Sequence, residues 1–374
     1  MKIALITFHH VINYGSALQS YATQTILERL GAQVDVIDYV NNVNRDDLLL
    51  KNRANESRFG SIPVVRELYM AFMAYDIQHM TEVFSKYWKE RLHLTERFFS
   101  CEEIEKGLSK QYDAYCTGSD QVWNTHVSPN SQGVDPAFYL EFAPKGAYCF
   151  SYAASFGMKS VKEEEGRSIQ EKLKKYRHIS VRETTGLEIL RKLGYSDAKL
   201  VLDPTFLLKK EEWRQLEQPI KTPEHYILTY QLHKNPAMKQ YIKRMSQKTG
   251  LPVVNISFSW RGYLQSRYAA YGIRPEQFVY LFDHADYVIT DSFHATCFSV
   301  IFKKPFVSIY SDPFNNRMES ILTLTGLNQR HLKDYDDENC LTAPVKFEQA
   351  EKVIQMELMA SIQWLKMVIG EIEK

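Results

Sequence analysis

The chain has 374 residues, of which 44% are hydrophobic and 24% charged, so it can bury a substantial core without disulfides or metal ions. At roughly 100 to 200 residues per domain, this length predicts two domains. The 46 Lys and Arg nearly cancel the 45 Asp and Glu, leaving a net charge of +1, which argues against a nucleic-acid-binding surface.

The cysteines and the lengths of the apolar runs indicate the cellular compartment of the chain. Five scattered cysteines without a Cys-x-x-Cys pair favour a reducing, cytoplasmic environment. The apolar run at 2–8 is too short for a signal peptide, and none reaches the roughly 18 residues of a membrane span. We therefore expect any membrane contact to be peripheral.

The N-terminal part alternates apolar runs with segments of helical spacing, which predicts an α/β fold. A helix is predicted over 16–30, between two strands, and residues 41–61 are polar and predicted to form a long excursion. One or two helices are expected over 63–99, which is rich in aromatics and Met. The predicted strands are 2–8, 34–40, 112–117, 148–153, 179–181 and 199–202.

A second α/β series follows a charged stretch, 209–224, that Pro219 and Pro223 interrupt, so a domain boundary is expected near 205–224. The last 28 residues have apolar side chains at steps of three and four, which predicts one amphipathic helix. The predicted strands of this series are 225–232, 252–258, 286–290 and 306–310, and the predicted helices are 236–249, 275–284 and 292–303.

Because parallel sheets place ligands at the carboxyl ends of their strands, polar residues just after strands are the candidate site residues. The first strand leads into Asn13, Tyr14, Gly15 and Ser16 ahead of a helix. The amino end of that helix could bind an anionic ligand. A turn at Gly15 with a cap from Ser16 is the alternative, and spacing alone leaves both open.

A second polar segment, 118–124, follows the strand predicted at 112–117. Ser119 and Asp120 would lie at its carboxyl end, with Trp123 and Asn124 close behind. Asp120 could accept a proton from a hydroxyl group, or it could cap a helix. The sequence does not separate these two interpretations.

Arg182 lies between a short apolar run and the next predicted helix. A guanidinium can bind a carboxylate or phosphate through two parallel hydrogen bonds, a geometry that Lys cannot copy. The alternative is an internal pair with Glu183 or a surface salt bridge.

The segment 290–296 brings Ser292 and His294 from a strand into the first turn of an apolar helix. An imidazole there could act as acid, base or anion donor, or it could be a core histidine bonded to a backbone carbonyl. Downstream, Lys304 and Arg317 could add positive charge, although a solvated surface explains lysines equally well.

Several other motifs are absent from the sequence. There is no Gly-x-Gly-x-x-Gly and no phosphate-loop motif, so nucleotide cofactors are not supported. The histidines and carboxylates lack metal-ligand spacing, and no metal is expected. A Gly-x-Ser-x-Gly elbow is also missing, which argues against nucleophilic catalysis.

Taken together and in order, six motifs resemble those of the polysaccharide pyruvyl transferase family. The resemblance extends from residue 1 to about residue 320. The motifs are residues 13–19, 118–124, 151–157, 180–183, 202–205 and 291–294.

The resemblance implies an α/β fold of two Rossmann-like domains facing a cleft, similar to the GT-B glycosyltransferases. On this basis we expect an N-terminal domain over 1–208 on the acceptor side, a C-terminal domain over 209–345 on the donor side, and a helix over 346–374 packing across both. The implied reaction transfers pyruvate from phosphoenolpyruvate to a sugar of a bacterial surface polysaccharide precursor as a cyclic ketal. Phosphoenolpyruvate is then a co-substrate, with no other cofactor.

The resemblance also implies roles for individual residues. Arg182 and His294 match positions assigned to donor binding and catalysis, and Arg317 matches a further basic residue. Some members carry an arginine where this chain has Ser292. Ser292 and Lys304 complete the expected donor site.

The acceptor side and the general base are also expected from these motifs. Asp120 is a candidate base for the sugar. The expected cleft-lining or acceptor residues are Asn13, Tyr14, Gly15, Ser119, Trp123 and Asn124.

The expected partners are phosphoenolpyruvate and a sugar acceptor, free or lipid-linked, at the inner face of the cell membrane. No nucleic acid is expected. Two other functions remain open at this stage: a nucleotide-sugar glycosyltransferase of the same architecture, and a non-catalytic sugar-binding member of a polysaccharide-assembly complex.

Overall fold

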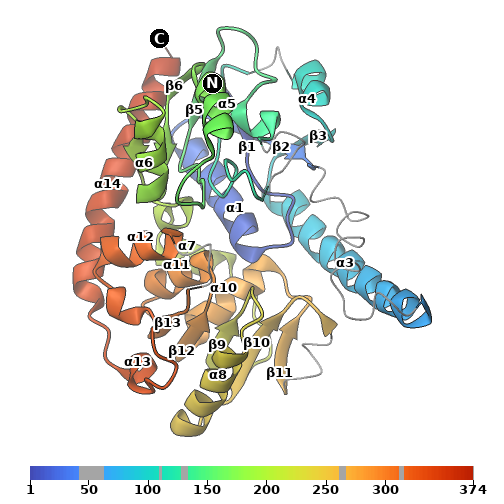
Figure 1. The fold of residues 1–374 in the computed structure, drawn as a ribbon, viewed down its shortest axis with the longest axis vertical. Helices are drawn as coiled ribbons and strands as arrows, with labels where there is room; N and C mark the ends of the chain where they lie inside the picture. The colour runs from blue at the N-terminus through green and yellow to red at the C-terminus, as the bar shows by residue number, and fades with distance from the viewer. Residues whose placement is uncertain (42–62, 109–111, 128–133, 261–266, 311–315, 374) are drawn as a thin grey trace. The chain divides into compact units, whose positions relative to one another are not determined.

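The computed structural model describes residues 1–41, 63–108, 112–127, 134–260, 267–310 and 316–373 (Figure 1). The chain divides into two units. Unit 1 comprises Met1–Pro204 and Ala360–Lys374, and unit 2 comprises Thr205–Met359. Apart from Asn41, the polar excursion expected over 41–61 lies outside the described residues.

Unit 1 is built on a six-stranded parallel sheet with the strand order β3-β2-β1-β4-β5-β6. The order reverses between β1 and β4, where Ile3 pairs with Ala114. Such a reversal opens a crevice at the carboxyl ends of the two strands, where open α/β sheets bind ligands. The strands are β1 (Lys2–Ile6), β2 (Gln33–Tyr39), β3 (Leu94–Phe98), β4 (Ala114–Thr117), β5 (Tyr148–Ser151) and β6 (Tyr176–His178), and a separate parallel pair joins β7 (Ser180–Val181) to β8 (Lys199–Leu200).

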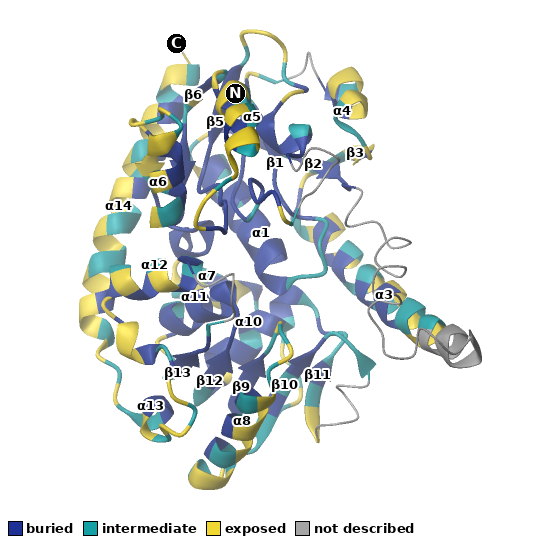
Figure 2. Cartoon of the chain, viewed as in Figure 1, coloured by how far each residue is buried: buried dark blue, intermediate teal, exposed yellow. Residues whose placement is uncertain are grey.

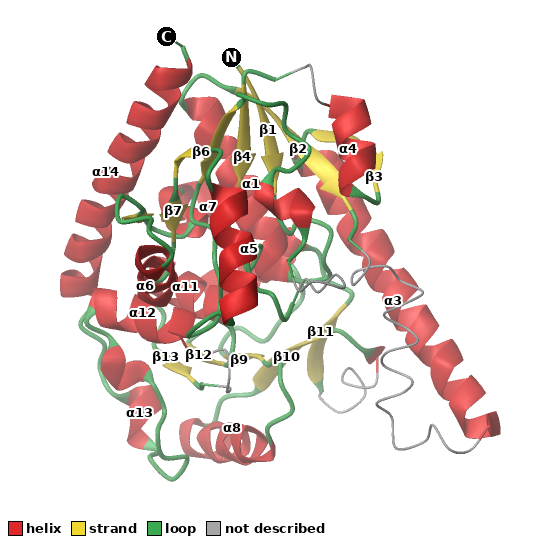
Figure 3. Ribbon diagram, turned by 45° about the horizontal axis from the view of Figure 1, so that its top comes forward, coloured by secondary structure: helices red, strands yellow, loops and turns green. Residues whose placement is uncertain are grey.

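Helices of unit 1 alternate with these strands, as the sequence predicts (Figure 3). The segment 63–99 forms one helix, α3, and then the edge strand β3, which the sequence analysis missed. The helices are α1 (Tyr14–Arg29), α3 (Pro63–Arg91), α4 (Cys101–Leu108), α5 (Glu163–Leu173), α6 (Thr184–Lys192) and the 3-10 turn η2 (Pro136–Tyr139).

The core of unit 1 is rich in aromatic side chains. Trp123 stacks on Tyr139 with ring centroids 5.6 Å apart and donates its indole N–H to the carbonyl of Phe138 at 3.2 Å. A buried indole needs such an acceptor, and the bond sets the orientation of the ring. This packing holds the segment that follows β4 against the rest of the unit.

Unit 2 contains a five-stranded parallel sheet with the order β11-β10-β9-β12-β13. This order also reverses once, between β9 and β12, where Tyr230 pairs with Thr290. The two sheets therefore share one topology, apart from an extra edge strand in unit 1. The strands are β9 (Ile227–Tyr230), β10 (Val253–Ser257), β11 (Tyr268–Tyr271), β12 (Tyr287–Thr290) and β13 (Phe306–Ser308).

Local signals begin and end the helices of unit 2. Asn235 caps α8 by accepting from the backbone of Met238, and Gly250 ends it with a φ of +72°, which favours glycine. The charged stretch 209–224, expected only as a boundary, contains the helix α7 because Trp213 is buried. The helices are α7 (Lys210–Leu216), α8 (Pro236–Thr249), α10 (Pro275–His284), α11 (Phe293–Ile301), α12 (Asn316–Thr325), α13 (Asn339–Thr342) and the 3-10 turns η3 (Pro204–Leu207) and η4 (Asn328–Arg330).

The C-terminal helix α14 (Phe347–Ile372) is the single amphipathic helix that the sequence predicts. Its residues up to Met359 belong to unit 2 and those from Ala360 onward to unit 1. Strands of both sheets are largely buried, whereas much of α14 is exposed or intermediate (Figure 2). Among the described residues, no helix combines the length and the hydropathy needed to cross a bilayer.

Candidate active site

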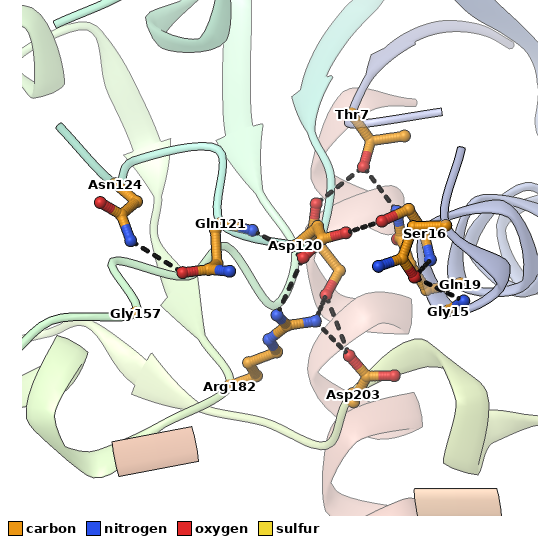
Figure 4. Close-up of polar contacts among 12 residues, drawn as sticks. Thr7, Gly15, Ser16, Gln19, Asp120, Gln121, Asn124, Gly157, Arg182 and Asp203 are labelled. Carbon is orange, nitrogen blue, oxygen red and sulfur yellow. Dashed lines mark hydrogen bonds and ion pairs between the residues drawn. The ribbon is translucent and has the colours of Figure 1, made fainter. Parts of the chain in front are cut away.

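In unit 1, polar side chains gather at the carboxyl ends of β1 and β4, where the strand order reverses. Thr7 follows β1 and donates its hydroxyl to the backbone carbonyl of Ser119, two residues after β4, at 2.7 Å. Gln19 of α1 donates to the Thr7 hydroxyl at 2.9 Å. These bonds join the ends of the two strands and belong to a larger polar cluster (Figure 4).

Arg182, which follows β7, lies at the centre of this cluster. Its guanidinium contacts a carboxylate oxygen of Asp203 at 2.7 Å and one of Asp120 at 3.1 Å. It also donates to the hydroxyl of Ser119 at 3.1 Å, which in turn donates to Asp203. The Arg182 side chain is completely buried, so these bonds replace its contacts with water.

Asp120 holds an unusual backbone conformation within the cluster. Its φ of +78° lies in the left-handed region, which a non-glycine residue adopts at a cost of about 1–3 kcal/mol. Its Oδ2 accepts from the hydroxyl of Ser16 at 2.5 Å, and its Oδ1 accepts from the backbone N–H of Gln121 at 2.9 Å. Together with Arg182, these donors fix the carboxylate.

Charges within the cluster compensate one another. Burial by itself lowers the pKa of the Arg182 guanidinium, but Asp203 and Asp120 beside it raise that pKa above its usual value. One buried cation therefore compensates part of the charge of two buried carboxylates, which leaves a net charge of −1 for the three groups. The resemblance implied that Arg182 binds an anionic donor, whereas in the structure its partners are carboxylates of the protein.

The amino end of α1 is capped by a side chain of its own. Asn13 Oδ1 accepts from the backbone N–H groups of Gly15 at 2.9 Å and Ser16 at 3.3 Å. Of the two interpretations left open by the sequence, the geometry supports the cap, with Asn13 as the capping residue in place of Ser16. Tyr14 is fully buried beside Phe84, and burial raises the pKa of its phenol.

Trp123 and Asn124 were expected to line a cleft, and the structure places both inside unit 1. Trp123 is only 1% exposed and belongs to the aromatic core, because its large apolar ring gains most from burial. Asn124 is 2% exposed and donates to Gln121 Oε1 at 2.7 Å. Gly157 has a φ of +61°, and a Cβ there would also clash with Gln121 Oε1, so this position strongly favours glycine. Both residues support the loop after β4.

In unit 2, the corresponding cluster lies at the carboxyl end of β12. Ser292 caps α11, accepting from the backbone N–H of Ala295 at 3.4 Å, and its own N–H donates to the hydroxyl of Thr290 at 3.0 Å. His294 therefore enters the first turn of α11, as predicted, and is 5% exposed. The positive end of the α11 dipole lies at this turn.

Arg317, in the first turn of α12, joins this cluster. Its guanidinium carbon lies 5.5 Å from the ring centroid of Phe293, the residue before His294. The ring of Phe293 in turn lies 5.1 Å from that of His294. The structure thus brings Ser292, His294 and Arg317 to the same end of α11.

Lys304 does not lie with these residues, contrary to expectation. It precedes β13 and is at the amino edge of the sheet, whereas His294 follows β12 at the carboxyl edge. The nine residues of α11 separate these positions by about 13 Å at 1.5 Å per residue. Burial lowers the pKa of Lys304, and the carboxylate that most opposes this shift is Asp283 of α10.

Three potential metal ligands lie close together at the amino edge of the unit 2 sheet. They are Glu217, Asp283 and His284, whose potential ligand atoms lie within 4.8 Å of one another. Asp283 is already bonded to the guanidinium of Arg214 at 2.6 Å and lies 3.5 Å from Lys210. These cations already balance the charge of Asp283, so the group is an ion-pair cluster at the amino edge of the sheet.

Two acidic residues of these clusters were not among the predicted site residues. Asp203 belongs to the family motif at 202–205, but only the tertiary structure shows that it binds Arg182. Asp291 precedes Ser292, and its buried carboxylate accepts from the backbone of Leu232 at 2.7 Å, in the loop after β9. The signal available in each case was an Asp directly after an apolar run.

Comparisons with known proteins are consistent with this architecture. The model of the polysaccharide pyruvyl transferase family matches residues 13–313. A comparison with curated proteins finds no match. A Listeria monocytogenes protein assigned as a UDP-N-acetylglucosamine 2-epimerase is similar in structure, with a TM-score of 0.56 and 11% identity over 95% of this chain and 90% of that one.

A second similar structure is that of Arabidopsis thaliana UGT89C1 complexed with UDP-L-rhamnose. Its TM-score is 0.53 with 12% identity, over 99% of this chain and 98% of that one. At such identities the likeness concerns the fold alone. It confirms the prediction of an α/β protein with two Rossmann-like domains, similar to the GT-B glycosyltransferases.

Proposed function

Because the chain belongs to the polysaccharide pyruvyl transferase family, we propose that it transfers pyruvate from phosphoenolpyruvate to a sugar of a polysaccharide precursor, forming a cyclic ketal and releasing phosphate. The observation that best supports this reaction is the cluster of His294 and Arg317 at the amino end of α11. It offers an imidazole, a guanidinium and a helix dipole at one switch point.

Phosphoenolpyruvate requires a site rich in donors and positive charge. It carries a carboxylate and a phosphate on one three-carbon unit, and both groups bind well to guanidinium and to helix amino ends. Arg317 and the first turn of α11, with Ser292 as its cap, form the proposed donor site. Because Lys304 lies at the opposite edge of the sheet, it has no part in that site.

The proposed chemistry needs a proton at the methylene carbon of the donor. His294, held as imidazolium beside the bound anion, supplies this proton while a sugar hydroxyl attacks the central carbon. A second hydroxyl closes the ketal as phosphate leaves. Acid–base help of this kind typically contributes 10²- to 10⁴-fold in rate.

The unit 1 cluster has a supporting role in this proposal. The guanidinium of Arg182 is bonded to Asp120 and Asp203, so we assign to it the task of fixing the ends of β4 and β7. Both oxygens of Asp120 accept from the protein, through Ser16, Gln121 and Arg182. This arrangement favours Asp120 as a structural acceptor over Asp120 as the base.

The acceptor belongs to the same proposal. Family membership points to a polysaccharide precursor, and such precursors are built on free or lipid-linked sugars. We expect the protein to catalyse this transfer on the cytoplasmic side. If the acceptor is lipid-linked, we expect the protein to associate peripherally with the membrane. Tyr14 and Gly15 are buried, so of residues 13–15 only the partly exposed Asn13 remains a proposed acceptor-side residue.

The test is an assay of the full chain with phosphoenolpyruvate and a panel of free and lipid-linked sugars. Acceptor-dependent phosphate release, with a mass gain of one pyruvate less water in the glycan, is the expected result. His294→Gln is expected to lower kcat 10²- to 10⁴-fold without a change in Tm. Tyr21→Phe, on the buried helix α1, provides a matched control that should retain activity.

Two results would contradict the proposal. Release of a nucleoside diphosphate from an activated sugar, with no use of phosphoenolpyruvate, would indicate a glycosyltransferase. Saturable binding of the sugar with no turnover of either donor would indicate a non-catalytic sugar-binding protein.

A further inference from the structure

A second imidazole lies at the switch point of unit 2, in the loop that follows β9. Asp291, directly after β12, has a fully buried carboxylate. That carboxylate accepts from the backbone N–H groups of Leu232 at 2.7 Å and His233 at 2.9 Å. It also lies 3.1 Å from the Nδ1 of His233. The loops after β9 and β12 are thereby tied together at the edge that carries His294.

This contact sets the tautomer of His233. An ionised carboxylate can only accept hydrogen bonds, so the Nδ1 of His233 carries the proton that it shares with Asp291. The Nε2 of a neutral ring then carries the lone pair and can take up a proton. A buried carboxylate that orients an imidazole and stabilises its protonated form is the arrangement that makes histidine an effective general base.

Exposure and position distinguish this pair from other histidine–carboxylate pairs of the described residues. The His233 side chain is 40% exposed and Asp291 is not exposed at all. In the pair of His9 and Asp38, the imidazole is fully buried and has no access to a substrate. His225 precedes β9, so its pair with Asp286 lies at the amino edge of the sheet, away from the switch point.

We propose that His233, oriented by Asp291, is the second acid–base residue of pyruvyl transfer and acts opposite His294. The inference rests on the proposed function, which needs one group to give a proton and another to remove one. His294 and His233 follow the neighbouring strands β12 and β9, which pair through Thr290 and Tyr230. The base is thus placed in the same unit as the acid.

The proposed steps conserve protons and electrons. In the first step, the hydroxyl oxygen bonds to the central carbon of phosphoenolpyruvate, its proton passes to Nε2 of His233, and His294 gives a proton to the methylene carbon, which becomes a methyl group. In the second step, the bond from that carbon to the phosphate oxygen breaks, and His233 returns its proton to the departing phosphate. A second hydroxyl then bonds to the central carbon and gives its proton to His294.

Two variants test the roles of this pair. His233→Ala is expected to lower kcat about 10²-fold or more, and free imidazole in the assay is expected to restore part of that rate. Asp291→Asn, which alters only the positioning group, is expected to lower kcat about 10- to 100-fold. The imidazole effect separates a chemical role from a structural one, because a loop defect would not respond to it.

His225→Ala is the matched control, since it removes the imidazole of a similar pair at the amino edge of the same sheet. It should leave kcat unchanged. Wild-type turnover by His233→Ala on an acceptor that the native protein uses would overturn the role of His233 and leave the proposed function standing. Absence of phosphoenolpyruvate turnover by the native protein on the whole acceptor panel would overturn both.

Discussion

The switch points of the two sheets occupy equivalent places in one topology, yet their side chains differ in kind. At the ends of β1 and β4, Arg182 is completely buried between Asp120 and Asp203. At the ends of β9 and β12, His233 is 40% exposed and Arg317 is only partly buried. The polar groups of the first cluster bind one another, whereas the second cluster leaves an imidazole and a guanidinium partly accessible to solvent.

This difference follows from how burial treats charge. A buried ion pair gains little net stability, because desolvation offsets its attraction, but it strongly favours one geometry. A partly exposed imidazole or guanidinium keeps its ability to exchange protons or bind anions. We infer that unit 1 supplies a fixed frame at its switch point and that unit 2 supplies the reactive groups.

Replacing the two arginines separately tests this contrast and has the largest expected effect. Arg182→Met leaves two buried carboxylates without their cation, which should lower the free energy of unfolding by about 3–5 kcal/mol. Arg317→Met should cost less, about 1 kcal/mol for the contact with Phe293, because the Arg317 side chain is only partly buried. Denaturant titrations of both variants provide the measurement.

Activity should depend more on Arg317 than stability does. Arg317→Met is expected to raise the KM for phosphoenolpyruvate about tenfold, the effect of losing one charged hydrogen bond. Should Arg182→Met fail to fold, Arg182→Lys keeps the charge and tests the geometry. Equal stability of Arg182→Met and the native chain would show that the buried cluster does not hold unit 1 together.

The imidazole of His10, which follows β1, sharpens the comparison through its effect on stability at different pH values. Burial lowers the pKa of His10 to about 3, with His9 and Arg97 acting in the same direction and Asp38 opposing them. In the unfolded chain this pKa is near 6.5. The folded state therefore binds fewer protons than the unfolded state between pH 6.5 and 3, and stability falls as the pH drops through this range.

His10→Phe should remove this loss while keeping a ring beside Trp88, whose centroid lies 4.6 Å from that of His10. Relative to the native chain, the variant should gain at most roughly 1.4 kcal/mol per pH unit on acidification. Urea unfolding at pH 7, 6 and 5 measures this difference. Parallel curves for the two proteins would mean that the ring is protonated alike in both states.

The two helix caps at the switch points give the smallest expected effect. Asn13→Ala should destabilise by about 1 kcal/mol, because it removes an acceptor from two backbone N–H groups of α1. Ser292→Ala should cost less, since its oxygen accepts a single bond of 3.4 Å. Thermal unfolding of both variants compares them, and a larger loss for Ser292→Ala would reverse the ranking.

The sequence predicts those strands that are apolar on both faces, and through them most of the fold. The three missed strands, β3, β6 and β11, are all sheet edges. An edge strand is covered less completely and carries polar residues, so β3 reads Leu94–Phe98 with Thr, Glu and Arg in its interior. Its spacing does not distinguish it from the end of the preceding helix.

The sequence could predict where the candidate site residues lie, but it could not predict which of them bind one another. Ser119, Asp120, Ser292 and His294 follow apolar runs, and parallel topology places such residues at the carboxyl edge. Trp123 was assigned to a cleft on its motif alone, whereas the gain from burying an indole places it in the core.

Local sequence was enough to predict the α/β alternation and the residues available at the strand ends, because these depend on neighbours within one or two turns of chain. The tertiary structure determined which charged side chains pair with one another. Arg182 binds Asp120 and Asp203 at separations of 62 and 21 residues, and His233 meets Asp291 across 58. Such pairs form only when the sheet brings distant strand ends together and excludes water, conditions that local spacing does not encode.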